Sequence, residues 1–301
     1  METVQRTLTL EVALQNNARA VERTLDRLLP EVEGPEHRLL NAMRYATFAG
    51  GKRLRPFLVM SGAELFRVAQ DRALRVAAAL ECVHTYSLVH DDLPCMDDSD
   101  LRRGQPSLHV AFDEATAVLA GDALLTFAFE ILSDRATHDD PGVRSELVAQ
   151  LALAAGARGM VGGQMIDLVS EGQHLDIGAI NRLQHMKTGA LISFAAEAGA
   201  ILGHGSMESR HALKGYAQNL GLAFQITDDL LDAEGDPEEV GKRLGKDAKA
   251  QKATFLTILG PDRAKMQAKM LADQAVQYLE IFGKSANLLR DVARFVVERR
   301  L

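Results

Sequence analysis

The chain has 301 residues, of which 47% are apolar and 25% are charged, a composition typical of a globular protein with a substantial core. A net charge of −7 argues against a surface that coats nucleic acid, so any anion site must come from a local basic cluster. Cys82 and Cys95 have neither metal-ligand spacing nor a disulfide framework, and no signal peptide is visible, so we expect a cytoplasmic protein.

Helical signals predominate along the chain. Val21, Leu25 and Leu28 recur at the i, i+4, i+7 spacing of one helical face. Two further stretches are rich in Ala and Leu, residues 151–160 and 191–202. The most apolar stretch, residues 117–132, contains a glycine and two acids, so we expect a buried helix and not a membrane span. Because no run alternates apolar and polar residues, the sequence predicts an all-α fold.

Clusters of Gly, Pro and charged residues separate the helical stretches. The predicted breaks are residues 28–38, 50–56, 93–106, 137–142, 171–178, 203–206, 234–252 and 260–263. None has the length or composition of an interdomain linker, so we predict one domain over residues 1–301, built as a bundle of helices. Residues 232–252 are either a solvated loop or a mobile lid, because long polar loops in compact domains often have a function.

A basic cluster precedes one predicted helix. The segment GGKRLRP places Lys52, Arg53 and Arg55 just before Pro56, which suits the first turn of a helix. Cations at a helix N-terminus oppose the helix dipole, so a partner of opposite charge is expected. The segment is either a basic surface turn or an anion site, and a diphosphate would satisfy it.

A first acidic cluster, HDDLPCMDDSDLRRG, follows another predicted helix. Pro94 ends that helix, so Asp91 and Asp92 lie on its last turn and Asp97 must fold back from the following turn. Carboxylates at a helix C-terminus meet the negative end of the dipole, so a cation is expected there. Mg²⁺ fits, because it typically takes one or two carboxylates together with phosphate oxygens. The EF-hand pattern of a calcium loop is not met.

A second acidic cluster, QITDDLLDAEGD, follows an apolar run. Asp228 and Asp232 are four residues apart and share one helical face. Taken alone, this cluster is better explained as a solvated helix end. Two such clusters, each beside an apolar helix and each followed by Lys or Arg, favour a magnesium-diphosphate site.

These motifs resemble those of the trans-isoprenyl diphosphate synthase family, most closely its bacterial farnesyl diphosphate synthases. The matching segments are GGKRLRP, HTYSLVHDDLPCMDDSDLRRG, GGQMIDL, MKTGALI, GLAFQITDDLLD and VGKRLGKD. They occur in the order typical of the family and span residues 40–255. The resemblance implies a helical bundle of the isoprenoid synthase type around a deep central cavity, and a homodimer.

The resemblance also implies the ligands of the metal and of the allylic diphosphate. Up to three Mg²⁺ ions would be bound with that substrate by Asp91, Asp97 and Asp228; Asp92 is counted with them, and Asp232 is a weaker candidate. Arg102, Lys187 and Lys242 would add positive charge to the same diphosphate.

A second substrate, isopentenyl diphosphate, is expected in the basic cluster. By resemblance its ligands are Gly51, Lys52, Arg55, His84 and Arg103, and Lys252 matches a lysine near a closing loop although residues 250–256 read AQKATFL. From the residues alone, His84 is as well explained as a buried structural histidine.

The implied reaction is ionisation of an allylic diphosphate followed by condensation with isopentenyl diphosphate. Similar enzymes shield the carbocation with oxygen dipoles, here from Thr188 and Gln225, and exclude water. Gln164 and Asp167 either face the cavity or form a polar pair within the bundle.

Product length is expected to depend on the residues just before the first acidic cluster. By resemblance these are Tyr86 and Ser87, and an aromatic residue there is typical of a C15 product. A helical wheel places Ser87 about 40° from Asp91 but Tyr86 about 140° away, so periodicity alone does not direct Tyr86 into the cavity.

Three alternatives are open. A geranylgeranyl diphosphate synthase would share these motifs. A terpene cyclase would not need GGKRLRP, and a non-catalytic partner subunit usually has a degraded aspartate motif, whereas both motifs are intact here.

Overall fold

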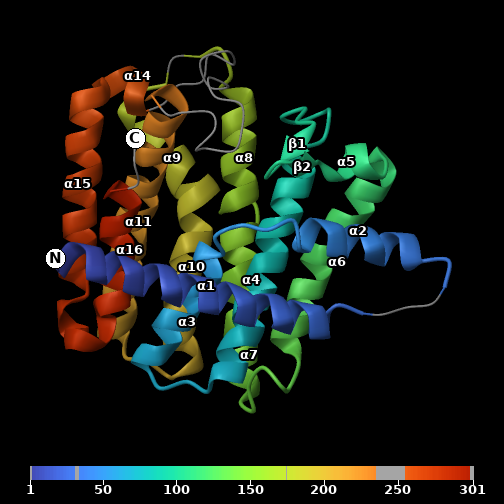
Figure 1. The fold of residues 1–301 in the computed structure, drawn as a ribbon, viewed down its shortest axis with the longest axis horizontal. Helices are drawn as coiled ribbons and strands as arrows, with labels where there is room; N and C mark the ends of the chain where they lie inside the picture. The colour runs from blue at the N-terminus through green and yellow to red at the C-terminus, as the bar shows by residue number, and fades with distance from the viewer. Residues whose placement is uncertain (1, 31–33, 174, 235–254, 299–301) are drawn as a thin grey trace.

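Helices form nearly all the regular structure. The computed structural model describes residues 2–30, 34–173, 175–234 and 255–298. Its elements are α1 (Glu2–Leu28), α2 (His37–Thr47), α3 (Leu54–Leu65), α4 (Gln70–Asp91), β1 (Leu101–Arg102), β2 (Gln105–Pro106), α5 (Leu108–Ala111), α6 (Glu114–Ser133), α7 (Pro141–Ala155), α8 (Met160–Val169), α9 (Ile177–Gln184), the π-helix η1 (His185–Gly189), α10 (Ala190–Leu202), α11 (Met207–Glu234), α14 (Phe255–Leu259), α15 (Pro261–Tyr278), the 3₁₀ helix η2 (Glu280–Ala286) and α16 (Asn287–Glu298). The prediction of an all-α fold is confirmed (Figure 1).

Gly and Pro positions account for most element boundaries. The breaks predicted at residues 137–142, 203–206 and 260–263 separate consecutive helices, and residues 191–202 form α10 with one added residue. The helical reading of residues 151–160 is wrong over its second half. There α7 ends at Ala155, with Gly156 as an extended C-cap, and α8 begins only at Met160. Glycine ends the helix because it has no side chain to pack and because ordering its flexible backbone costs more conformational entropy than ordering any other residue.

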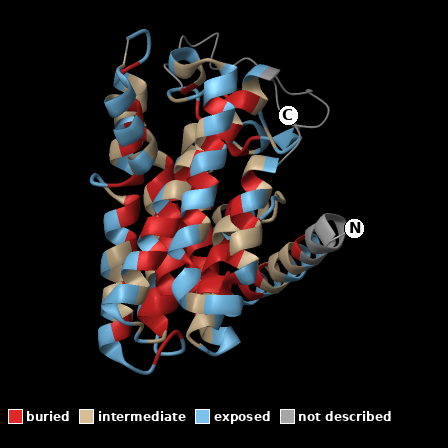
Figure 2. Ribbon diagram, turned by 90° about the vertical axis from the view of Figure 1, so that its left-hand side faces the viewer, coloured by how far each residue is buried: buried red, intermediate tan, exposed pale blue. Residues whose placement is uncertain are grey.

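Helix α4 lies at the centre of the core. Five consecutive residues, Val76 to Leu80, have 0% exposure and cover more than one turn of about 3.6 residues, so neighbouring helices surround this part of α4. Figure 2 shows buried residues concentrated in the middle of the bundle and exposed ones on its outside. The buried cluster runs from Leu10 to Val296. The single domain over residues 1–301 stays a prediction.

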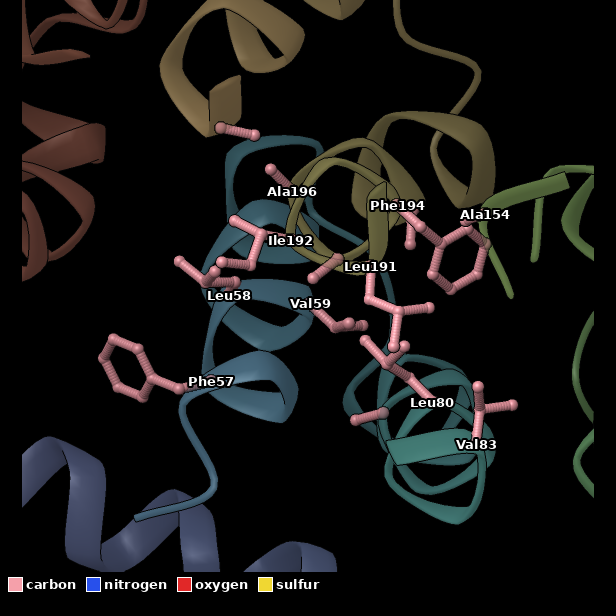
Figure 3. Packing of buried hydrophobic residues seen from close by; sticks show 14 of the residues in the cluster. Phe57, Leu58, Val59, Leu80, Val83, Ala154, Leu191, Ile192, Phe194 and Ala196 are labelled. Carbon is pink, nitrogen blue, oxygen red and sulfur yellow. The ribbon is translucent and has the colours of Figure 1, made fainter. Parts of the chain in front are cut away.

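Helices α3 and α10 meet α4 through fully buried aliphatic side chains. Figure 3 shows Val59 of α3 and Leu191 of α10 beside Leu80 of α4, and all three are 0% exposed. Burial of each such side chain stabilises the fold by about 1.5–3 kcal/mol.

Helix α6 contains the apolar stretch that we predicted to be buried. Within the described part of the chain it is the one helix long and apolar enough to cross a membrane, and half of that window is buried inside the protein. Ala117, Ala120 and Leu124 are fully buried, whereas Leu119 is 58% exposed. The helix packs against α4 and α2, as a core helix does.

A short β-ribbon follows the first acidic cluster, where we predicted only a loop. β1 and β2 pair antiparallel through Leu101 with Pro106 and Arg102 with Gln105. The two connecting residues, Arg103 and Gly104, have φ values of 54° and 77°, as a type I′ hairpin turn requires. The sequence did not predict this hairpin, because its turn has Arg103 before Gly104 where the usual signal is Asn, Asp or Gly before Gly. Figure 1 shows this ribbon and α14 toward the same end of the bundle.

Candidate active site

The turn after α4 brings Asp91 and Asp97 together. The Asp97 amide donates a hydrogen bond to the Asp91 carbonyl at 2.8 Å, and the Asp98 amide donates to the Leu93 carbonyl at 3.1 Å. Asp98 has a φ of 45°, a conformation that Asn and Asp tolerate better than most residues. The chain therefore folds back over the helix end, as predicted from Pro94.

Asp91 is the acid of this turn that lines the large cavity. Burial raises the pKa of its carboxyl to about 6; the nearby Lys187 opposes the shift, and Asp97 adds to it. The ammonium of Lys187 lies 2.6 Å from Oδ2 of Asp167. A buried carboxyl beside a second carboxyl is stabilised in its charged form by a bound cation.

Asp92, the next residue, does not line the large cavity with Asp91. Its residue is 2% exposed, and the Arg102 guanidinium donates to both of its carboxylate oxygens, from Nε at 3.1 and 3.0 Å and also from Nη2. In this structure the Asp92 carboxylate therefore holds Arg102, and its place in the sequence-based ligand set stays a prediction. Arg102 still keeps 32% of its side chain exposed.

The second acidic cluster also contains one buried, hydrogen-bonded aspartate beside others that are partly exposed. Asp229 is 4% exposed and accepts from Gln225 Nε2 at 2.9 Å and from the Phe255 amide at 3.2 Å. Asp228 and Asp232 are partly exposed on α11. Burial lowers the pKa of Arg55, and the carboxylates of Glu81 and Asp228 partly oppose that shift, so Asp228 faces the same region as Arg55. Lys242 and Lys252 lie outside the described residues.

These acids fit a magnesium ion that shares its ligands with a phosphate. Across the described ranges, no three or more His, Cys, Asp or Glu side chains converge into a closed metal cage. Mg²⁺ does not need one, because it is usually held by one or two carboxylates, waters and substrate phosphates. Asp91 and Asp97, brought together by their backbone hydrogen bond, match that arrangement.

The basic cluster forms a second, smaller cavity of about 160 Å³. Lys52, Arg55, His84 and Arg103 contribute to its lining. The Arg103 guanidinium donates to the Gly50 carbonyl and lies against Gly51, where a Cβ would come within 2.5 Å of Arg103 Cζ. Only glycine therefore allows this close approach, and the φ of 121° at Gly51 also requires it.

His84 is neutral within this cluster. Its Nε2 lies 3.4 Å from Arg55 Nη1, and because arginine only donates, Nε2 must accept and Nδ1 carries the proton. Burial holds the pKa of His84 well below its ordinary value, and the cations Arg55 and Arg103 lower it further. Arg55 Nε is buried without a hydrogen-bond partner. The cluster thus offers donors and positive charge to an anion.

Arg53 has a different role from its two basic neighbours. Its side chain is 0% exposed, bonds Glu81 Oε1 at 2.5 Å and donates to the Thr47 carbonyl at 2.5 Å. The sequence pattern groups Arg53 with the basic cluster and does not reveal its pairing with Glu81. The signal that could have revealed it is Glu81, an acid inside the apolar run AAALECV, which requires a buried cation.

The large cavity has a volume of about 450 Å³ and lies between α4, α6, α8 and η1. Its apolar lining residues include Leu88, Leu93, Val118, Met160 and Leu168. This volume is within the range of about 300–1,000 Å³ typical of sites for small organic ligands.

Polar groups also line this cavity. The π-helix η1 contributes Lys187 and Thr188, and π-helical turns inside α-helices are frequent at functional sites. The Thr188 hydroxyl donates to Gln225 Oε1 at 3.2 Å, which connects η1 to the helix that carries Asp228.

Tyr86 and Ser87 both line the large cavity. Tyr86 is 6% exposed, and its ring lies 5.7 Å from that of His90 in an edge-to-face arrangement. Periodicity did not direct Tyr86 there, because the cavity is wide enough to touch α4 on more than one face. Its role in product length stays a prediction.

The two cavities share Arg55 and His84. An apolar cavity that has Asp91 in its lining and a cationic cavity are therefore adjacent, with Arg55 and His84 between them. The predicted residues Asp91, Lys187 and Thr188 belong to the first cavity, and Lys52 and Arg103 belong to the second.

Comparisons with known proteins agree with this geometry. Residues 36–288 match the model of the family described as polyprenyl synthetase. The chain is 42% identical over 285 residues to a farnesyl diphosphate synthase of Escherichia coli, covering 92% of this chain and 94% of that one. It is 39% identical to a geranylgeranyl diphosphate synthase of Cyanophora paradoxa, with 99% of both chains covered.

A solved structure is similar over the same length. An FPP/GFPP synthase from Zymomonas mobilis superposes with a TM-score of 0.88 at 50% identity, covering 96% of this chain and 99% of that chain. The ordered motifs, the helical bundle and these near-full-length matches show that the chain belongs to the polyprenyl synthetase family and is a trans-prenyltransferase.

Proposed function

We propose that the protein is a magnesium-dependent farnesyl diphosphate synthase. It would condense isopentenyl diphosphate with dimethylallyl or geranyl diphosphate to give (2E,6E)-farnesyl diphosphate and diphosphate. The observation that carries the proposal is the pair of adjacent cavities that share Arg55 and His84. One cavity is apolar and has the Asp91 carboxylate in its lining, and the other is cationic, which suits two diphosphate substrates of different tail length.

The allylic substrate would place its tail in the 450 Å³ cavity and its diphosphate beside Asp91. Asp91, Asp97 and Asp228 would hold Mg²⁺, which when bound supplies Lewis-acid stabilisation to the leaving diphosphate. Lys187 and Arg102 add positive charge at the same end of the cavity. Because Asp167 and Asp92 respectively hold these two side chains, their charges are already positioned before the reaction begins.

Isopentenyl diphosphate would bind in the 160 Å³ cavity on Lys52, Arg55 and Arg103. The allylic C1–O bond breaks, and its electron pair leaves with the diphosphate oxygen. The double bond of isopentenyl diphosphate then supplies the electrons of the new carbon–carbon bond to C1, and a proton is lost to the released diphosphate. The apolar lining of the large cavity keeps water from capturing the cation.

Tyr86 supports a C15 product. Its ring is almost fully buried in the cavity lining and is held edge-to-face against His90, so we propose that it limits the length of the growing tail. A geranylgeranyl diphosphate synthase is the second candidate, because a relative of that name is 39% identical over nearly the whole chain. A terpene cyclase has no use for a second cationic cavity, and a non-catalytic partner has no need for the buried Asp91 site.

The deciding experiment is incubation with isopentenyl diphosphate, geranyl diphosphate and Mg²⁺, followed by sizing of the products by chromatography. We expect C15 as the main product and none when the metal is chelated. A main product of C20 would assign the chain to the second candidate, and no condensation at all would overturn the proposal. We also propose a homodimer, which light scattering of the purified chain would test, and a cytoplasmic location.

A further inference from the structure

Gln164 is a buried amide whose polar atoms have no partner. It lies on α8 and lines the large cavity. Both its Oε1 and its Nε2 are shielded from solvent and make no hydrogen bond. Whichever way the amide group is oriented, a buried acceptor and a buried donor therefore stay unpaired within the wall of the cavity.

An apolar residue would suit this position better for folding alone. Met160 and Leu168, one turn before and one turn after Gln164 on α8, also line the cavity. A methionine at position 164 would continue this apolar stripe without leaving polar atoms unsatisfied. Buried polar groups without partners destabilise a fold, and they are rare enough that each one requires an explanation.

The position of Gln164 along the cavity provides that explanation. Gly163, the preceding residue, packs so closely against η1 that a Cβ there would come within 2.3 Å of the Lys187 amide nitrogen. Asp167, in the next turn of α8, binds the Lys187 ammonium at 2.6 Å. Gln164 therefore lies about one turn from the Lys187–Asp167 ion pair and lines the cavity together with Lys187 and Thr188, where the carbon next to a bound diphosphate would sit.

We propose that Gln164 is a further catalytic residue, whose amide oxygen faces the allylic carbon that becomes positively charged. The inference rests on the proposed prenyl transfer. When the C1–O bond breaks and its electron pair leaves with the diphosphate, positive charge spreads over C1 and C3 of the tail. An oxygen dipole already held in a dry cavity stabilises that charge without reorganising and exchanges no proton or electron.

An amide suits this task better than a carboxylate would. A glutamate at position 164 would be drawn into an ion pair with Lys187, and its charged oxygen would be a competing nucleophile for the cation. A neutral amide supplies the dipole and leaves Lys187 with Asp167 and the diphosphate.

If Gln164 serves catalysis and not folding, replacing it should lower kcat without lowering thermal stability, and a single substitution tests both expectations. In Gln164→Met, we expect kcat for condensation of geranyl with isopentenyl diphosphate to fall about tenfold or more. Thermal unfolding should occur at the same or a higher temperature, because two unsatisfied atoms are removed. Gln184→Met is the matched control. Gln184 Oε1 is also buried without a partner, but that residue lies outside the cavity lining, so its kcat should stay at the wild-type value.

A binding measurement that does not depend on turnover completes the test. The probes are a prenyl diphosphate analogue with an ammonium group near C3 and its neutral carbon counterpart, titrated calorimetrically with Mg²⁺ present. We expect the preference for the charged analogue to fall about tenfold in Gln164→Met and to be unchanged in Gln184→Met.

Wild-type kcat and wild-type charge preference in Gln164→Met would overturn the inference, and would show that the amide binds a water or only fills space. Failure of the wild-type protein to condense the two substrates would instead overturn the proposed function.

Discussion

The buried ion pair between Arg53 and Glu81 permits a quantitative prediction. Both side chains are almost fully buried, at 0% and 2% exposure, and their N···O distance is 2.5 Å. In Arg53→Met, Glu81 would keep its buried charge and lose its counter-ion. Breaking a buried pair by removing one partner typically costs about 3–5 kcal/mol. Position 53 has a left-handed φ of 48°. Arginine and methionine are both L-residues with a Cβ, so this conformation costs the wild type and the variant about the same and does not affect the difference in unfolding free energy.

Urea unfolding followed by circular dichroism measures this difference. We expect Arg53→Met to lower the free energy of unfolding by about 3–5 kcal/mol, and the double variant Arg53→Met/Glu81→Met to recover most of it, because an apolar pair needs no desolvation. Arg72→Met is the surface control. Its partner Asp139 is 71% exposed, so the loss should be at most about 1 kcal/mol.

The same pair positions the cationic cavity. Glu81 lies one turn before His84 on α4, and Arg53 lies two residues before Arg55. We therefore expect the double variant, although folded, to show a raised KM for isopentenyl diphosphate and a nearly unchanged KM for geranyl diphosphate. The reasoning would be refuted if Arg53→Met cost less than about 1 kcal/mol, since that would mean that water reaches Glu81.

Three further predictions follow from single side chains. Tyr86→Ala should shift the product beyond C15, because the ring that limits the cavity is removed; an unchanged product by chromatography would count against Tyr86 as the limit. Below about pH 6.5 the unfolded chain protonates His84 and the folded chain does not, so stability should fall by up to about 1.4 kcal/mol per pH unit as the pH drops. His84→Gln should remove that part of the slope in urea unfolding at pH 7 and 5.5, and an identical slope would contradict it. Asp91→Asn should weaken calorimetric Mg²⁺ binding in the presence of an inert geranyl diphosphate analogue by about tenfold or more, whereas equal binding would exclude Asp91 as a ligand.

Local chemistry was sufficient for much of the fold and for the outline of the site. The boundary at Asp91 follows from Pro94, which cannot continue the helix, and the return of Asp97 follows from the short turn behind it. Apolar runs between Gly and Pro clusters predicted helices, because the residues that share a helical face are only three or four positions apart in the sequence.

The tertiary structure decided which charged residues face the cavities. Asp91 and Asp92 are neighbours of the same residue type. Only the position of Arg102 on the hairpin shows that the Asp92 carboxylate accepts hydrogen bonds from Arg102. Arg53 and Arg55 are two residues apart, yet only Arg53 forms an ion pair with the buried Glu81 of α4.

The shape of the cavity is also a property of the assembled bundle. Tyr86 lines it despite its angle from Asp91, and Gln164 lines it because Gly163 allows α8 to touch η1. The sequence by itself determined the helical class, several helix ends and the presence of two acidic clusters and a basic one. The partner of each charge and the walls of each cavity were decided by contacts between residues far apart in the chain, which no local spacing encodes.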